Sequence, residues 1–363
     1  MKRISTLVSL LLLSNSFTFA DSLSIKEAIE KGKTSADISV YHENTDAKNS
    51  QSNSGLTSGS LGLNYETDSF NGFSTSLGFR ANHEFYEKNK GVDYKESYEN
   101  DAIMNIASLK YANEDLSISI GRQEIDLEWL GDFNEAVVAQ ITTIPNNNIT
   151  IGYTKRQAEI GIDFVEDFRN INENKGVYVI DVKNTNFENI ELNPYFYSAP
   201  DLTDFYGFKF SYDNDLFGTT AHYALSSEDT QKNGNIYNLE ARLNILGFAL
   251  SSGYIGTQKD VGAGNISNFG DNMSPLDDGE QVYSADAKTI YATASYPIND
   301  LTLKAIYGTT QFGENNLDAD EFNLIAEYSI SEELSTALTY VDYKEDQNDS
   351  NYEKLFANIT YSF

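Results

Sequence analysis

The sequence predicts an all-β protein: a transmembrane, antiparallel, up-and-down β-barrel of about 18 strands, with 16 as the alternative count. Three observations predict it. Apolar and polar residues alternate along most of the chain from residue 34, which is the period of a strand with one apolar face. Short turns and long polar connections also alternate, as they do at the two ends of a bacterial outer-membrane barrel. The first 20 residues have the form of a secretory signal peptide.

Residues 1–20 form the expected signal peptide. Lys2 and Arg3 precede an apolar run at 7–13, and the segment finishes on the small residue Ala20, where we expect cleavage. The run is too short to span a bilayer as a helix, and no later stretch has 18 apolar residues in a row. A retained N-terminal anchor is the alternative. We expect the mature chain to leave the cytoplasm without a helical anchor.

The composition narrows the classes of partner. The formal net charge is −30, which argues against nucleic acid because phosphate binding needs clustered Lys and Arg. With no cysteine there is no disulfide scaffold. Tyr (24) and Phe (21) are frequent and Pro (5) is scarce, as suits β-structure. A soluble β-sandwich would share this composition, so periodicity must decide between the two.

The chain divides into three parts: the signal peptide, a short periplasmic helix over 21–33, and a barrel domain over 34–363. In 60–66, for example, Leu61, Leu63 and Tyr65 face one way, and Gly62 and Asn64 face the other. Apolar Ile325 and Phe356 are exceptions, since each falls on the polar face of its strand. The expected strands start near residues 34, 59, 73, 102, 116, 134, 149, 176, 190, 204, 219, 235, 248, 285, 301, 319, 334 and 352.

The alternation has a physical cause in a membrane. Lipid cannot hydrogen-bond a backbone, so a sheet in a bilayer must close on itself. The final strand, 352–363, should therefore pair with the first. Its alternate apolar residues and terminal Phe363 resemble the signal read by the barrel-insertion machinery. The outer face must be apolar and the inner face can be polar. The expected partners are outer-membrane lipid and lipopolysaccharide outside, and small polar solutes and ions inside.

Several segments resemble the OprD-like family of outer-membrane porins. These are "SIKEAIEKGKTSADISVYHE" near the N-terminus, "DLSISIGRQEIDLEWL" (115–130), "FNEAVV" (133–138) and the hairpin 59–80. The resemblance implies an 18-stranded channel in the outer membrane of a Gram-negative bacterium. It also implies passive uptake of small solutes, a lumen-facing ladder of basic residues that guides carboxylate substrates, and, as is common among porins, a homotrimer.

The link after the "GRQ" motif departs from this family. There it often forms a long constriction loop, whereas here only about 129–134 separates the two strands. Either another loop narrows the pore, with 259–284 as the candidate, or the lumen is wider. The motif residues are Gly121, Arg122 and Gln123. Arg122 shares its strand face with apolar Ile118 and Ile120, so it points away from the lumen unless a bulge intervenes, and its role rests on the resemblance.

Strand alternation assigns charged residues to the lumen, because Lys or Arg on the lipid face near the bilayer midplane costs about 2–4 kcal/mol. Rows of opposite charge across a water channel set an ion preference; solvated wall charges that pair with one another are the alternative. The basic candidates are Arg80, Lys110, Arg156, Lys209, Arg242, Lys304 and Lys354. The acidic candidates are Asp37, Glu66, Asp181, Asp213, Glu240, Glu321 and Glu327.

The sequence thus predicts a water-filled channel for passive diffusion of ions and small hydrophilic solutes, with a cation preference set by the negative charge. A substrate-specific channel for small carboxylates or amino acids, and a non-conducting adhesin or structural barrel, are the alternatives. We expect no enzyme, no cofactor and no metal site. The three histidines, His42, His83 and His222, lie in no catalytic or zinc-binding motif.

Overall fold

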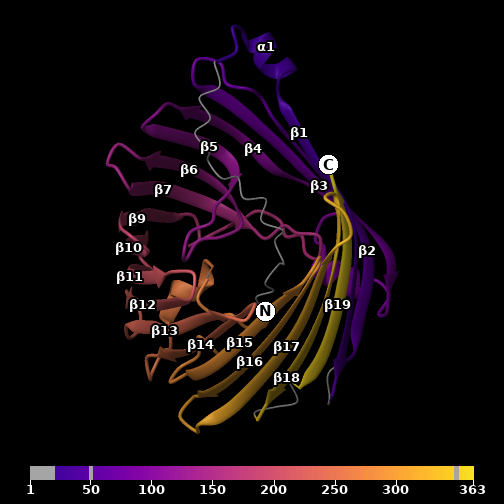
Figure 1. The fold of residues 1–363 in the computed structure, drawn as a ribbon, viewed down its shortest axis with the longest axis vertical. Coiled ribbons are helices and arrows are strands. Elements are labelled where there is room, and N and C mark those ends of the chain that lie inside the picture. Colours follow the sequence, from indigo (N-terminus) through magenta and orange to yellow (C-terminus); the bar gives the residue numbers. More distant parts are fainter. Residues whose placement is uncertain (1–20, 49–51, 271, 347–350) are drawn as a thin grey trace.

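The protein is a closed β-barrel. Its computed structural model describes residues 21–48, 52–270, 272–346 and 351–363, so the expected signal peptide, residues 1–20, lies outside the described residues. The described strands form one antiparallel sheet that wraps round an interior crossed by loop segments (Figure 1). Eighteen strands of 9 to 15 residues build the described wall, as the sequence predicts.

The strand positions follow the sequence closely. The largest difference is at β2, which begins at Ser54 rather than near residue 59, because its first residues already pair with the far end of β1. A further two-residue strand, β8, pairs with β7 inside a long connection. The strands are β1 (Lys33–Ala47), β2 (Ser54–Glu66), β3 (Phe73–Glu87), β4 (Ala102–Ala112), β5 (Leu116–Glu124), β6 (Phe133–Ile141), β7 (Asn147–Ala158), β8 (Arg169–Asn170), β9 (Val177–Phe187), β10 (Ile190–Ala199), β11 (Thr203–Asp213), β12 (Phe217–Glu228), β13 (Gly234–Ile245), β14 (Phe248–Thr257), β15 (Lys288–Ile298), β16 (Leu301–Phe312), β17 (Leu317–Ser329), β18 (Leu334–Glu345) and β19 (Tyr352–Ser362).

The last strand closes the barrel on the first. β19 pairs with β1 over eleven positions, from Asp37 opposite Ser362 to Ala47 opposite Tyr352. Every other long strand pairs with its neighbours in the chain. Backbone N–H and C=O groups along the seam are therefore satisfied, which is the condition for a sheet to exist in lipid. The predicted pairing of the first and last strands is confirmed.

The two ends of the barrel differ. Tight turns such as 246–247 and 299–300 join strands at the end that carries α1 (Ile25–Glu30), where Figure 1 also places the C-terminus. Ser24 caps this short helix, its Oγ accepting from the Glu27 N–H at 3.2 Å. Long connections at the other end hold α2 (Asp93–Ser97) and the 3₁₀ turn η1 (Gly264–Asn268). No helix in the described part of the chain is long and apolar enough to cross a membrane.

The two faces of the wall are chemically distinct. On β2, outward Leu61 and Leu63 are 47% and 45% exposed, whereas Ser58 and Ser60 on the inner face are buried. The two apolar exceptions, Ile325 and Phe356, pack against apolar clusters that include inward-folded loops. An apolar residue on the inner face thus marks a place where a loop covers the wall.

Candidate functional site: the constriction of the barrel

Two connections fold into the barrel and narrow it. Connection 125–132 joins β5 to β6, and connection 258–287 joins β14 to β15. Trp129 of the first and Leu276 of the second are at most 3% exposed, and both belong to one apolar cluster with wall residue Phe205. We call these segments the constriction loops. Connection 125–132 therefore reaches the lumen despite its eight residues, and the longer 258–287 does so as well.

Loop 125–132 is held by a chain of polar contacts to the wall. The Trp129 indole N–H donates to the Tyr195 hydroxyl at 2.6 Å. That hydroxyl also lies 2.8 Å from His222 Nε2. The Tyr195 ring lies against Gly207 on the next strand, where a Cβ atom would come within 1.8 Å of the ring. Glycine at this position therefore lets the tyrosine lie flat on the wall and reach the loop.

Glu128 supplies the second anchor of this loop. Its carboxylate accepts from Lys209 Nζ at 2.9 Å and lies 3.4 Å from His222 Nδ1. Burial raises the pKa of the Glu128 carboxyl above its usual range, while Lys209 opposes the shift. Protein groups thus lie close to both ring nitrogens of His222, which is the arrangement of a structural histidine.

Loop 258–287 is tied to the opposite wall by an ion pair. The Asp278 carboxylate accepts from Lys354 Nζ at 2.7 and 2.9 Å, with side-chain exposures of only 4% and 6%. Beside it, the buried Glu321 carboxylate accepts the backbone N–H groups of Asp278 and Gly279 at 3.0 and 2.8 Å. We call this set the Asp278–Lys354 latch. Its two ion-paired residues are 76 positions apart in the sequence, and their contact fixes the tip of the loop inside the barrel.

A second pair of connections, 88–101 and 159–176, packs against the inner face of strands β1 and β2. Tyr98 and Val165 are almost fully buried in one cluster with Leu56 of the wall. Short backbone ladders join the two connections, with the Val165 N–H donating to Ser97 O at 2.8 Å. The interior is consequently narrowed from two sides.

The family motif residue Arg122 lies where β4 and β5 separate. Pairing between these strands ends at Arg122, and the preceding Gly121 has φ +121°, a conformation that favours glycine. The Arg122 guanidinium donates to the carbonyl of Met104 at 2.8 Å, which lies beyond the last β4–β5 pair, and to Glu135 at 2.9 Å. Its Cζ lies 4.2 Å from the ring centroid of Phe168. The arginine thus bridges the gap between the two strands.

The basic candidates are mostly neutralised by neighbours. Lys110 and Lys304 make no ion pair within the described ranges. The other five pair with carboxylates: Arg80 with Asp37 (2.9 Å), Arg156 with Glu135 (3.0 Å), Lys209 with Glu128 (2.9 Å), Arg242 with Glu240 (2.7 Å) and Asp213 (3.0 Å), and Lys354 with Asp278 (2.7 Å).

The acidic candidates fall into three groups. Asp37, Asp213 and Glu240 hold arginines, as described. Asp181 is 1% exposed and accepts from Asn193 Nδ2 at 2.9 Å, while Glu321 belongs to the latch. Glu66 and Glu327 are exposed strand residues that make no ion pair among the described residues. A pore-lining role for these residues stays a prediction.

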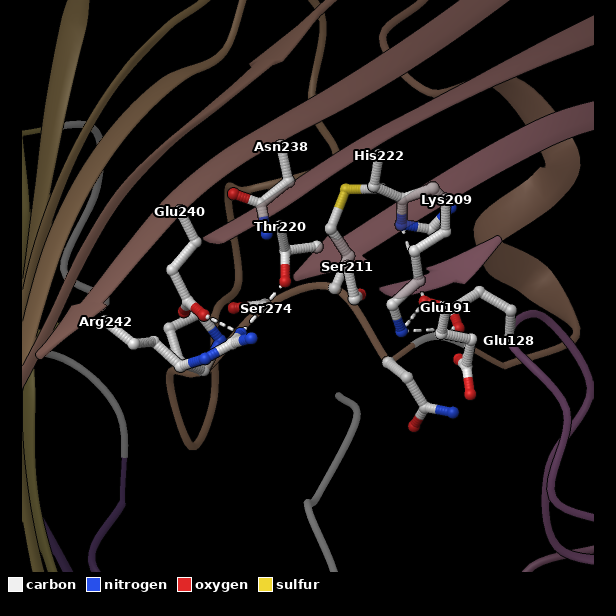
Figure 2. Close-up of a pocket in the computed structure, with 13 residues that line it drawn as sticks. Glu128, Glu191, Lys209, Ser211, Thr220, His222, Asn238, Glu240, Arg242 and Ser274 are labelled. Atoms are coloured by element: carbon white, nitrogen blue, oxygen red, sulfur yellow. Dashed lines mark hydrogen bonds and ion pairs between the residues drawn. The ribbon is translucent and has the colours of Figure 1, made fainter. Parts of the chain in front are cut away.

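A polar cavity of about 300 Å³ lies between loop 258–287 and strands β10–β13. Figure 2 shows Lys209 and Glu128 at one side of it and Arg242 and Glu240 at the other. Its lining is Glu128, Glu191, Lys209, Ser211, Thr220, His222, Asn238, Glu240, Arg242, Asn272, Met273, Ser274 and Pro275. The cavity brings together three of the predicted charged residues with loop residues that alternation could not assign.

Sequence reasoning missed the residues that build the constriction. Glu128 and Asp278 lie in connections, where strand alternation carries no information. Trp129 had one usable signal: it is the only tryptophan in the chain. A lone large aromatic in a short polar link indicates a buried anchor rather than a solvated turn.

Taken together, these features define a class of protein. A closed barrel with an apolar exterior, a polar interior and inward-folded loops is a transmembrane channel of the outer membrane. The chain belongs to the Gram-negative porin family, whose model matches residues 33–351. The expected porin and its outer-membrane location are confirmed, and the expected OprD-like type is consistent with the family and with the fold of the solved structures below.

Solved structures share the fold. OpdO of Pseudomonas aeruginosa has a TM-score of 0.78 and 11% identity, with 93% of this chain and 98% of that chain covered. OccAB4 of Acinetobacter baumannii has a TM-score of 0.75 and 14% identity, with 92% and 98% covered. OpdK of P. aeruginosa, solved with vanillate, has a TM-score of 0.75 and 11% identity, with 92% and 99% covered. No curated protein matches the sequence.

Proposed function

We propose that this porin is a water-filled channel for passive diffusion of ions and small hydrophilic solutes, and that it prefers cations. One observation carries the preference. At the constriction the basic side chains Lys209, Arg242 and Lys354 are each paired with a carboxylate. Further carboxylates remain beside them, including Asp213, which also contacts Arg242, and Glu191 of the cavity lining, so the fixed charge of the passage is negative. Negative fixed charge raises the local concentration of cations.

The same observation weakens the alternative of a channel dedicated to small carboxylates. OpdK was solved with vanillate, a carboxylate, but its 11% identity supports the fold alone. A row of lumen-facing Lys and Arg side chains attracts anions only when carboxylates of the protein do not already neutralise their charges. In this chain Arg80 and Arg242 are held by carboxylates at 2.9 and 2.7 Å.

Reconstitution into planar bilayers tests the channel itself. The purified protein is expected to add current in discrete, equal steps, because each inserted barrel contributes one fixed conductance. Solute uptake by liposomes, followed as swelling in small sugars, is expected in parallel. Protein that inserts without current or swelling would instead be a non-conducting adhesin or structural barrel. A homotrimer stays a prediction, which a mass measurement in mild detergent would test.

A further inference from the structure

In the cavity beside loop 258–287, some charged side chains are paired with an opposite charge of the described residues and one is not. It is lined by carboxylates of Glu128, Glu191 and Glu240 and by two cations, Lys209 and Arg242. Its volume of about 300 Å³ is at the lower end of the range for small-molecule sites. The lining is mostly polar and offers hydroxyl and amide groups in addition to the charges.

Both cations are already paired with carboxylates of the protein. Lys209 Nζ donates to both oxygens of Glu128, at 3.2 and 2.9 Å. Arg242 donates to Glu240 at 2.7 Å, to Asp213 at 3.0 Å and to the Thr220 hydroxyl at 2.9 Å. An anion that entered would have to displace these partners and leave carboxylates without a counter-ion. Anion binding here is therefore opposed.

Glu191 is the contrasting residue. It is partly exposed on β10 and lines the same cavity, and its side chain makes no ion pair or hydrogen bond among the interactions of the described residues. Figure 2 shows its side chain close to those of Glu128 and Lys209. Lys183 of β9 does not line the cavity and makes no ion pair with Glu191 within the described residues. A carboxylate in a polar cavity without a counter-ion favours a cationic guest.

We propose that this cavity is a binding site for small organic cations, of the primary-ammonium class, with Glu191 as the residue that pairs with the ammonium group. The proposal rests on the proposed channel function and adds a substrate class to it. Asn238 and Asn272 offer amide oxygens for the remaining N–H donors. A guest carrying a carboxylate of its own would meet Glu191, Glu128 and Glu240, which repel it.

Fluorescence of the detergent-solubilised protein tests this site without any need for conduction. Trp129 is the only tryptophan in the chain and follows Glu128 of the cavity lining. Titration of the wild type with 1,4-diaminobutane is expected to change the Trp129 emission until the site is saturated. In Glu191→Gln the apparent affinity for the diamine is expected to be about tenfold weaker, because the variant loses one charge-assisted hydrogen bond. Butanedioate, of the same length with opposite charge, is expected to give no saturable change.

The control variant is Glu332→Gln, which removes an exposed carboxylate in the turn between β17 and β18, outside the cavity, and is expected to leave the titration unchanged. Three results would overturn the proposal: equal affinity for the diamine in the wild type and in Glu191→Gln, no saturable response to the diamine, or tighter binding of butanedioate.

Stepwise potassium current in bilayers is measured separately. Absence of current with saturable binding refutes the channel function alone, and current without binding refutes the site alone.

Discussion

Replacing Lys354 by methionine is expected to release loop 258–287 from the wall and to increase single-channel conductance and current noise. The substitution shortens the unbranched side chain by only one heavy atom but leaves Asp278 buried without its counter-ion, beside Glu321. Breaking a buried ion pair by removing one partner costs about 3–5 kcal/mol. That cost shifts the equilibrium between seated and released loop by more than about 100-fold. Single-channel recording measures the outcome directly.

Lys304→Met is the matched control for this variant. Lys304 is also on a strand of the barrel but makes no ion pair among the described residues, so its loss removes the same charge without freeing a loop. Wild-type noise and conductance are expected for it, apart from a small change in ion preference. If Lys354→Met behaves like this control, the ion pair does not hold the loop.

The seating of the same loop is expected to depend on pH through Asp277. Burial raises the pKa of this loop carboxyl from 3.8 to about 7, with neighbouring Asp278 adding to the shift and Lys354 opposing it. Glu321 of β17 and Asp163 also face it and favour the protonated form. A released loop, surrounded by water, would return Asp277 to its ordinary pKa. The seated loop therefore binds the proton more tightly than the released loop.

The sign of the effect follows by linkage. The ratio of loop packed inside the barrel to released loop is highest below about pH 4. It falls by up to roughly tenfold for each pH unit between about 4 and 7, and it is constant above about pH 7. Conductance and open-channel noise should consequently rise as the pH increases through this window. In Asp277→Asn, which cannot ionise, most of the rise should disappear and low-pH behaviour should persist at pH 8. A variant that keeps the full pH response would refute the assignment to Asp277.

The wall of the barrel could be predicted from the sequence because strand alternation is local. Each side chain of a strand faces opposite to its neighbours, so apolar Leu61 and Leu63 can be assigned without knowing any distant partner. The strand count and most strand starts are recovered on this basis. Arg122 marks the limit, because Gly121, with its positive φ, and the parting of β4 from β5 alter the geometry at that strand end.

The sequence makes loop 259–284 a candidate for narrowing the pore, but the contacts of the constriction could not be predicted, because they join distant residues. Asp278 meets Lys354, and Trp129 meets Tyr195, 66 residues away. Neither connection has a periodicity that indicates which way it folds. Besides the single tryptophan, Trp129, the sequence has a trace on the wall, where Ile325 and Phe356 break the alternation. Both pack against clusters that contain inward-folded loops, so such exceptions are signals of buried contact rather than errors of register.

The zero-current potential in a salt gradient tests the central claim, that the passage is aqueous and carries negative fixed charge. With the wild-type protein in a planar bilayer, a tenfold gradient of potassium chloride at neutral pH is expected to make the dilute side positive. The value should approach the limit of about 59 mV for a monovalent cation. A dilute side that becomes negative would show anion preference and contradict the account, as would inserted protein through which no ionic current flows.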